Sequence, residues 1–239
     1  MSPVIAGGPV IPNYGKATGC IVDNNSFFCT KWIHQHWSDT LQPALVQHVW
    51  LTAIAVGIGF AIAFICALAA HRFNWLVPPI SAFTAFLYTI PSIALFQVLV
   101  PITGITITTI EIGLVGYTLL VLFGNTLAGL RSVPPDVIEA ARGMGLTRLQ
   151  VLRRVEIPLA LPAIGAGVRI AVVTTISLAT VAAYITPYGL GKPIFDGLQI
   201  NYHTEYVVAG LLAIGLALIA DGLLVLAQRA LTPWRRARA

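Results

Sequence analysis

Residues 49–70 read VWLTAIAVGIGFAIAFICALAA and contain no charged side chain, and Thr52 is the only hydroxyl residue among them. The hydrocarbon core of a bilayer is about 30 Å thick, so an α-helix needs about 20 consecutive apolar residues to cross it. The run has this length and is followed at once by His71 and Arg72, two polar residues suited to the membrane surface. It therefore predicts a membrane-spanning helix.

The composition of the whole chain agrees with this prediction. Of the 239 residues, 57% are hydrophobic and 10% are charged, whereas a soluble domain has about 25% charged residues. So few charges could not cover a soluble surface. The composition indicates a multi-pass protein of the cell membrane and argues against a cytosolic enzyme, a disordered chain or a nucleic-acid-binding protein.

Four further apolar runs reach spanning length. They are residues 79–100, interrupted by Pro91; 112–130, preceded by Glu111; 159–184, which contain Arg169; and 207–227, which contain Asp221. We therefore expect an all-α polytopic membrane protein with five transmembrane helices, which places the two termini on opposite sides of the bilayer.

The distribution of basic residues predicts the orientation, because cytoplasmic loops are enriched in Lys and Arg. One set of alternate loops holds ten basic residues, five of them in residues 131–158. The other set holds three, Lys16, Lys31 and Lys192. We expect the N-terminus outside and the C-terminus in the cytoplasm, and we interpret the net charge of +5 as a topology signal.

Three parts follow from this arrangement: an extracytoplasmic segment at residues 1–43, a transmembrane domain at 44–230 and a basic cytoplasmic tail at 231–239. We expect no signal peptide, because prolines interrupt the first segment and no basic region precedes an apolar run. Its second half, from Phe27 to Leu41, mixes aromatic and polar side chains, which is typical of an interfacial helix on the outer leaflet.

Two of the three cysteines, Cys20 and Cys29, lie in this external segment. Thiols that meet an oxidising compartment can form a disulfide. A Cys20–Cys29 bond is one interpretation, and two unpaired thiols are the other. The third cysteine, Cys66, lies in the first span and is expected to pack as a small apolar residue.

The most informative stretch is the predicted cytoplasmic loop, residues 131–158, which reads RSVPPDVIEAARGMGLTRLQVLRRVEIP. Pro134 and Pro135 suit the first turn of a helix, where a missing N–H removes no hydrogen bond. Gly143 and Gly145 suit its end, because glycine accepts the left-handed conformation. A short helix is therefore expected between these residues.

A second short helix should follow. Thr147, with Gln150 three residues later, forms a capping-box pattern, and Pro158 is expected to end that helix before the fourth span. Two short helices joined by a glycine hinge on the cytoplasmic side are typical of a docking element rather than of a plain connector.

This loop resembles the coupling loop of ABC-importer permeases, whose pattern is EAA, three residues, Gly, nine residues and I-x-L-P. Val155 and Ile157 replace the Ile and Leu of the pattern, and the register is intact. The resemblance assigns contact with the ATPase to Glu139, Ala140, Ala141, Gly143, Gly145, Val155, Ile157 and Pro158.

The resemblance implies a permease subunit that works with two ATP-binding cassette subunits, a second permease subunit, identical or related, and an extracytoplasmic solute-binding protein. ATP and Mg²⁺ would be bound by the partner ATPase. The chain itself has no G-x-x-x-x-G-K-[ST] loop and no Ser-His-Asp or H-E-x-x-H set. We therefore expect a non-catalytic subunit without a cofactor, and no metal site, since His34 and His36 lack further ligands.

Further stretches resemble the osmoprotectant branch of this family, whose members import glycine betaine, carnitine, choline or proline betaine. They are residues 88–95 (YTIPSIAL), 156–162 (EIPLALP), 165–169 (GAGVR) and 188–191 (YGLG). Related five-span permeases import methionine, which stays open as an alternative. A self-sufficient secondary transporter is a further alternative, although such carriers usually show internal repeats, and a membrane enzyme would need a catalytic set.

Two charges lie inside the predicted spans, where an ionisable group is costly and usually has a partner. Arg169 and Asp221 lie about 15 Å and about 12 Å from the cytoplasmic edge along their helices. These similar depths predict a buried ion pair between the fourth and fifth spans. The alternative is that Arg169 lines the transport path, although a bare cation there would repel a quaternary ammonium solute.

Polar residues on two spans are candidates for the transport path or its gate. They are Tyr88, Pro91 and Ser92 on the second span and Ser177, Thr180 and Tyr184 on the fourth. Proline interrupts helical hydrogen bonding and frees a carbonyl, which favours a hinge. Equally, such side chains can simply bond to their own helix.

Overall fold

The computed structural model describes residues 26–233, and within that range it is helical, with no strand. The N-terminal part comprises α2 (Thr30–His36), the π-helical turn η1 (Trp37–Leu41) and α3 (Gln42–Arg72). The 3₁₀ turn η2 (Asn74–Leu76), α4 (Val77–Thr89), α5 (Ser92–Thr103) and α6 (Ile107–Arg131) follow. The C-terminal part comprises α7 (Pro135–Gly143), α8 (Arg148–Val151), the π-helical turn η3 (Leu152–Glu156), α9 (Ile157–Ala182), α10 (Gly191–Gln199) and α11 (His203–Leu231).

Four helical stretches are long and apolar enough to cross a membrane: Thr30–Arg72, Ile107–Arg131, Arg148–Ala182 and His203–Leu231. A fifth span is formed only if α4 and α5 are counted together, because these helices are bent by 98° at the break between them. The second span is therefore not the straight helix that its hydropathy predicts. Ile90 is extended (ψ 128°), as expected for a residue that precedes proline.

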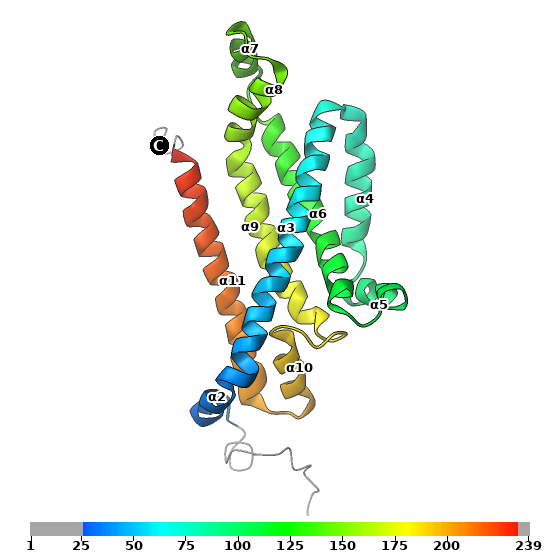
Figure 1. Cartoon of the computed structure of the whole chain (residues 1–239), viewed down its shortest axis with the longest axis vertical. Helices are drawn as coiled ribbons and strands as arrows, with labels where there is room; N and C mark the ends of the chain where they lie inside the picture. Colours follow the sequence, from blue (N-terminus) through cyan, green and yellow to red (C-terminus); the bar gives the residue numbers. More distant parts are fainter. Residues whose placement is uncertain (1–25, 234–239) are drawn as a thin grey trace, which may run out of the picture.

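The core of the bundle is formed by α3, α6 and α9, which pack along much of their length (Figure 1). Small residues allow this close approach. A Cβ added at Gly59 would lie 1.9 Å from the hydroxyl of Thr118, and one added at Gly129 would lie 3.0 Å from the carbonyl oxygen of Ala160. Gly59 therefore allows α3 to pack closely on α6, and Gly129 allows α6 to pack closely on α9.

The two ends of the bundle differ. Figure 1 shows α2 and α10 at one end and α7 and α8 at the other, with the C-terminal end of α11 pointing toward the α7 and α8 end. The first and last described residues therefore lie at opposite ends of the molecule, as an odd number of crossings requires. Which of the two ends faces the cytoplasm stays a prediction from the basic residues of the loops.

The expected interfacial helix is not a separate element. Residues 30–72 form one continuous helical stretch in which η1 links α2 to α3. Trp32 and Leu41 are buried, and Trp32 contacts Tyr202 edge to face at 5.5 Å. Phe27, Phe28 and Trp37 are the large apolar residues of this segment that stay exposed. The segment thus packs on the start of α11, and its position at the outer membrane surface stays a prediction.

Candidate functional site

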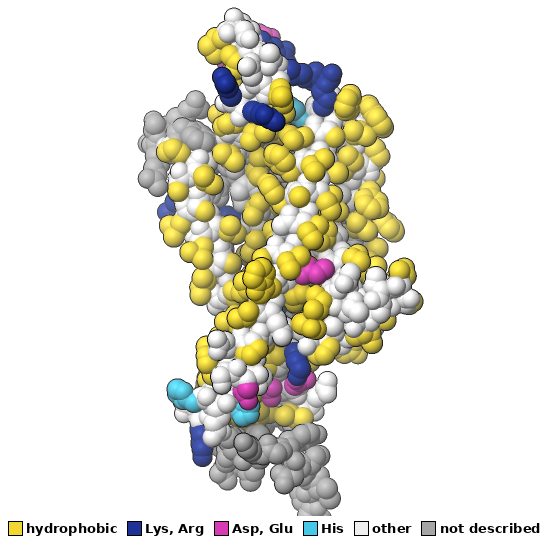
Figure 2. Space-filling model, in the orientation of Figure 1, with side chains coloured by type: hydrophobic (Ala, Val, Ile, Leu, Met, Phe, Trp, Pro, Cys, Tyr) yellow, Lys and Arg dark blue, Asp and Glu magenta, His cyan; other side chains and the backbone are white. Residues whose placement is uncertain are grey.

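The loop between α6 and α9 projects from one end of the bundle and carries a concentration of basic side chains (Figure 2). Its first helix, α7, begins as predicted, with Pro134 at the N-cap, Pro135 in the first turn and Asp136 beside the positive end of the helix dipole. Both prolines and Asp136 are exposed. The helix is therefore held away from the membrane-spanning bundle.

The end of α7 is a Schellman motif centred on Gly145. The Leu146 N–H donates to the Ala141 carbonyl at 3.3 Å, and the Gly145 N–H donates to that of Arg142 at 2.9 Å. Gly145 has φ +81°, a conformation that glycine adopts without a steric penalty. Gly143 does not share this role, because it is the last helical residue of α7 and is not among the positive-φ glycines.

The second helix also begins as predicted. The backbone N–H of Thr147 donates to Oε1 of Gln150 at 2.8 Å, and the Gln150 N–H donates to Oγ1 of Thr147 at 3.4 Å, which completes the capping box. Pro158, however, does not end this helix, because residues 148–182 form one helical stretch. The π-helical turn η3 precedes it, and Pro158 lies in the first turn of α9, where its missing N–H is tolerated.

The motif residues of α7 and of the turn that ends it differ in exposure. Ala141 is buried, with 2% of its surface exposed, whereas Glu139, Ala140, Gly143 and Gly145 are exposed. Ala141 therefore anchors the helix, and the others form an outward surface. The remaining motif residues, Val155, Ile157 and Pro158, are half-buried at the base of the loop.

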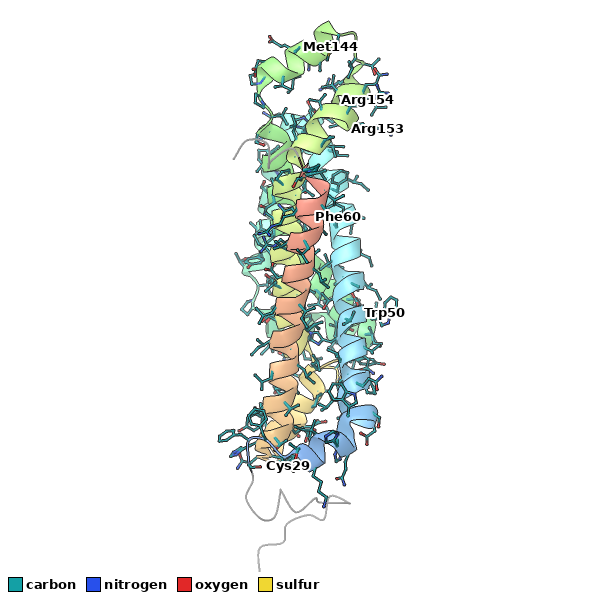
Figure 3. All side chains as sticks on the ribbon, turned by 90° about the vertical axis from the view of Figure 1, so that its left-hand side faces the viewer. Cys29, Trp50, Phe60, Met144, Arg153 and Arg154 are labelled. Carbon is teal, nitrogen blue, oxygen red and sulfur yellow. The ribbon has the colours of Figure 1, made fainter. Side chains whose placement is uncertain are left out.

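Two features of the loop were missed by reasoning from the sequence. Met144 is 74% exposed at the loop tip (Figure 3), so the outward surface includes one large apolar side chain. Glu156 is buried, and its Oε2 lies 3.1 Å from Nε2 of His71 at the end of α3. This contact ties the first span to the base of the loop. The sequence places a carboxylate and an imidazole 85 residues apart, with no local pattern that joins them.

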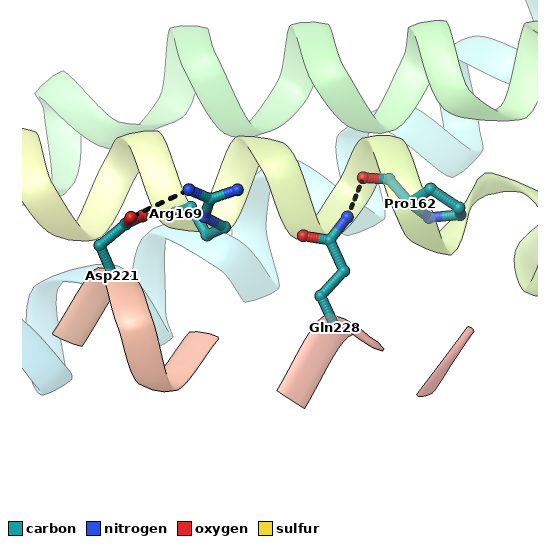
Figure 4. Close-up of polar contacts among 4 residues, drawn as sticks. All are labelled: Pro162, Arg169, Asp221 and Gln228. Atoms are coloured by element: carbon teal, nitrogen blue, oxygen red, sulfur yellow. Dashed lines mark hydrogen bonds and ion pairs between the residues drawn. The ribbon is translucent and has the colours of Figure 1, made fainter. Parts of the chain in front are cut away.

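Arg169 and Asp221 are brought together by α9 and α11 (Figure 4). Nε of Arg169 donates to one carboxylate oxygen at 2.8 Å, and a terminal guanidinium nitrogen donates to the other at 2.9 Å. The pair is not buried within this chain, because 34% and 35% of the two side chains are exposed. The two residues are therefore paired as expected and half-buried within this chain, and burial of the pair in the membrane stays a prediction.

A second polar link joins the same two helices. The side-chain amide of Gln228 donates to the carbonyl oxygen of Pro162 at 2.9 Å (Figure 4). Gly165 lies beside it, since a Cβ added there would come within 3.1 Å of the Gln228 amide. The contact is uncharged, unlike that of Arg169 with Asp221.

Within residues 26–233, no hydrogen bond or ring contact joins the candidate path residues of the second span to those of the fourth. Thr180 donates to the carbonyl of Ser177 on its own helix at 2.6 Å. Tyr184 is 61% exposed and contacts Phe195 edge to face, and Ser177 is exposed as well. Ser92 begins α5. The Thr180 hydrogen bond agrees with the interpretation in which such side chains bond to their own helix. The exposed Ser177 and Tyr184 are compatible with a transport path that forms between two permease chains.

The break at Pro91 has a defined partner. The carbonyl of Ile90, which lies at the break between α4 and α5, accepts a hydrogen bond from the hydroxyl of Tyr117 on α6. The Tyr117 ring also contacts the Tyr88 ring edge to face, with centroids 5.9 Å apart. The bend between α4 and α5 is therefore fixed against α6.

Replacing Tyr117 by phenylalanine should lower the free energy of unfolding by about 1 kcal/mol, because the Ile90 carbonyl loses its partner. Denaturant titration of the detergent-purified protein measures this. Tyr88→Phe is the matched control, since the Tyr88 hydroxyl makes no hydrogen bond within residues 26–233. Equal losses in the two variants would contradict a specific role for the Tyr117 hydroxyl.

Two other predictions concern the segment that is expected to be extracytoplasmic. Cys20 lies outside the described residues, so its pairing with Cys29 stays a prediction. Cys29 itself is buried, and its N–H donates to the hydroxyl of Thr204. Within residues 26–233, no three His, Cys, Asp or Glu side chains are placed to share a metal ion. His36 instead contacts the carbonyl of Trp32 at 3.0 Å.

The geometry is that of a helical bundle with one structured, basic loop at its end. Comparison with known proteins identifies its family. The family described as binding-protein-dependent transport system inner membrane component matches residues 53–236, and the chain belongs to this family. It is accordingly an inner-membrane component of a binding-protein-dependent transport system.

Curated relatives match over most of their length. The chain is 38% identical over 192 residues to the osmoprotectant import permease protein OsmW of Salmonella typhimurium, covering 78% of this chain and 89% of the relative. It is 33% identical over 188 residues to the glycine betaine/carnitine/choline transport system permease protein OpuCB of Bacillus subtilis, covering 78% and 86%.

Solved structures show the same fold. The MetNI methionine ABC transporter in an inward-facing conformation matches with a TM-score of 0.71 and 20% identity, over 85% of this chain and 100% of that chain. A bacterial alginate ABC transporter, in complex with an alginate-bound periplasmic protein, matches with a TM-score of 0.69 and 15% identity, over 90% and 87%.

Proposed function

We propose that the chain is the permease subunit of an ATP-driven importer for a compatible solute such as glycine betaine, carnitine, choline or proline betaine. The observation that carries the proposal is the match to a permease named for osmoprotectant import, which spans 89% of that relative. The loop geometry supports the importer part of the proposal, because α7 presents Glu139 and Ala140 outward at one end of the bundle.

In this proposal the loop lies in the cytoplasm and contacts an ATPase subunit. Two ATPases, a second permease chain and an extracytoplasmic binding protein complete the importer. The ATPases bind ATP and Mg²⁺, and their closure moves α7. Transport requires that closure favour one permease conformation over the other, because a partner shifts an equilibrium only through its different affinity for the two states. The rigid Schellman end of α7 suits the transmission of such a movement.

The half-exposed ion pair of Arg169 with Asp221 is compatible with contact with a second permease chain. Arg169 and Asp221 neutralise one another through a bidentate contact, so their partly exposed surface presents little net charge to a solute or to a neighbouring chain. A quaternary ammonium cation would meet an ion pair there rather than a bare guanidinium. The pair therefore acts in the structure of the bundle and not as a solute-binding cation.

A permease for an amino acid such as methionine is the alternative. The similarity to a methionine transporter is a similarity of fold, at 20% identity, whereas the relatives at 33% and 38% identity are named for osmoprotectants. The osmoprotectant assignment is therefore preferred.

The test is uptake by the reconstituted importer. The permease is assembled in proteoliposomes with its ATPase and binding protein, and ATP-dependent uptake of radiolabelled glycine betaine is measured in competition with carnitine, choline, proline betaine, proline and methionine. We expect the quaternary ammonium solutes to compete. Uptake of methionine in preference to betaine would refute the solute assignment, and a failure to bind any ATPase would refute the importer.

A further inference from the structure

A cavity of about 530 Å³ lies between the end of the first span and the projecting loop. Leu68, His71 and Arg72 of α3 form one wall, and Ile138 and Arg142 of α7 form another. The remaining wall comes from the start of the long helix that leads into α9: Arg148, Leu149, Val151, Leu152 and Glu156. The cavity is thus placed where a membrane-spanning helix meets the loop.

The charges that line the cavity are unbalanced. Three arginines line it, Arg72, Arg142 and Arg148, and Glu156 is the only acidic residue among the lining residues. That carboxylate is already engaged by His71 at 3.1 Å. Within residues 26–233, no carboxylate lies within ion-pair distance of Arg72, Arg142 or Arg148. The Arg72 guanidinium carbon lies 5.1 Å from the centroid of the Phe73 ring, a cation–π contact that does not neutralise its charge.

The other half of the lining is apolar. Leu68 lies one helical turn before the polar end of α3, and Ile138, Leu149, Val151 and Leu152 lie on the loop side. A free phosphate ion would need the guanidinium groups but not these side chains. A ligand that carries both a phosphate and an acyl or glycerol body would use both halves.

The cavity does not compete with the proposed ATPase contact. Ile138 and Arg142 are four residues apart and share one face of α7, and that face lines the cavity. Glu139 and Ala140 lie about 100° and about 200° round the helix from Ile138, and both are exposed. One face of α7 can therefore bind a ligand while the other contacts a partner.

We propose that this cavity binds the phosphate headgroup of an anionic phospholipid. Guanidinium groups are suited to phosphate, which they can engage through two parallel N–H···O bonds. Basic pockets at the ends of membrane-spanning helices are sites for anionic headgroups. A headgroup held by Arg72, Arg142 and Arg148 would join α3 to both helices of the loop and fix the loop's angle. The site requires that the loop faces the lipid surface, and it does not depend on which solute is carried.

The test measures lipid binding to the purified importer complex. The complex is placed in nanodiscs of equal parts phosphatidylcholine and phosphatidylglycerol, and the lipid retained after detergent extraction is quantified by native mass spectrometry. The wild type should retain phosphatidylglycerol over phosphatidylcholine. The double variant Arg142→Gln/Arg148→Gln should weaken this retention about 25-fold, since each basic residue near an anionic surface contributes roughly a factor of five.

The matched control is Arg153→Gln/Arg154→Gln, which removes the same charge from the same loop. Both residues are exposed and are not among those that line the cavity; Figure 3 labels them on the helix below the loop tip. The control should retain phosphatidylglycerol as the wild type does, and all variants should elute as the intact complex. An equal loss in the control would overturn the proposal in favour of diffuse attraction. Displacement of the lipid by inorganic phosphate at low millimolar concentration would overturn it in favour of a free anion.

Discussion

Replacing Gly145 by valine should reduce ATP-driven uptake about tenfold, because a non-glycine residue held in the left-handed conformation costs roughly 1–2 kcal/mol. Gly145 has φ +81° and no other heavy atom within 4 Å of the Cβ position. The cost is therefore one of backbone conformation and not of a clash. The fraction of loops with the native angle between α7 and α8 should fall by that factor, while the bundle itself is untouched. Uptake in proteoliposomes measures the effect.

The matched control is Gly145→Asn. Asparagine is the residue, after glycine, that most readily adopts positive φ, whereas valine is β-branched and disfavours it further. The asparagine variant should retain most of the uptake, and both variants should be inserted and bind the binding protein normally. If valine and asparagine reduced uptake equally, the left-handed turn would not be what the loop requires.

The loop was the part of the site most open to prediction from sequence, because its features are local. Proline at the start of α7, the left-handed Gly145 and the Thr147–Gln150 capping box each depend on a few neighbouring residues, and each is present. Pro158 was misjudged. A proline forbids one backbone hydrogen bond, but it can lie in the first turn of a helix when a π-helical turn precedes it.

Features that depend on distant contacts were less accessible. Hydropathy identifies residues 79–100 as apolar, and it carries no information on the 98° bend, which is held by the Tyr117 hydroxyl from another helix. The contact of His71 with Glu156 likewise joins separate elements. The pairing of Arg169 with Asp221 was accessible because both charges had to lie in spans at a similar depth, and a charge in a span needs a partner. The exposure of this pair could not be predicted, because a single sequence does not show which helix faces are left uncovered by the rest of the chain.

Asp221→Ala should reduce the yield of folded permease severalfold, and the double variant Arg169→Ala/Asp221→Ala should recover much of it. The single change leaves the Arg169 guanidinium without its two hydrogen bonds to the carboxylate, which are 2.8 and 2.9 Å long. A lone charge within a span is costly, and the cost disappears when both charges are removed. The yield is read as the monodisperse peak of a fluorescent-protein fusion in size-exclusion chromatography.

Gln228→Ala supplies the matched control, because it removes the neighbouring polar link between α9 and α11 without leaving a charge. Its effect should be smaller than that of Asp221→Ala. A double variant that is no better folded than Asp221→Ala would contradict the pairing as a source of stability. If the pair instead serves transport, the double variant should fold normally and lose uptake. Recovery of both folding and uptake would show that the two charges matter only to one another, which is the role that their bidentate contact predicts.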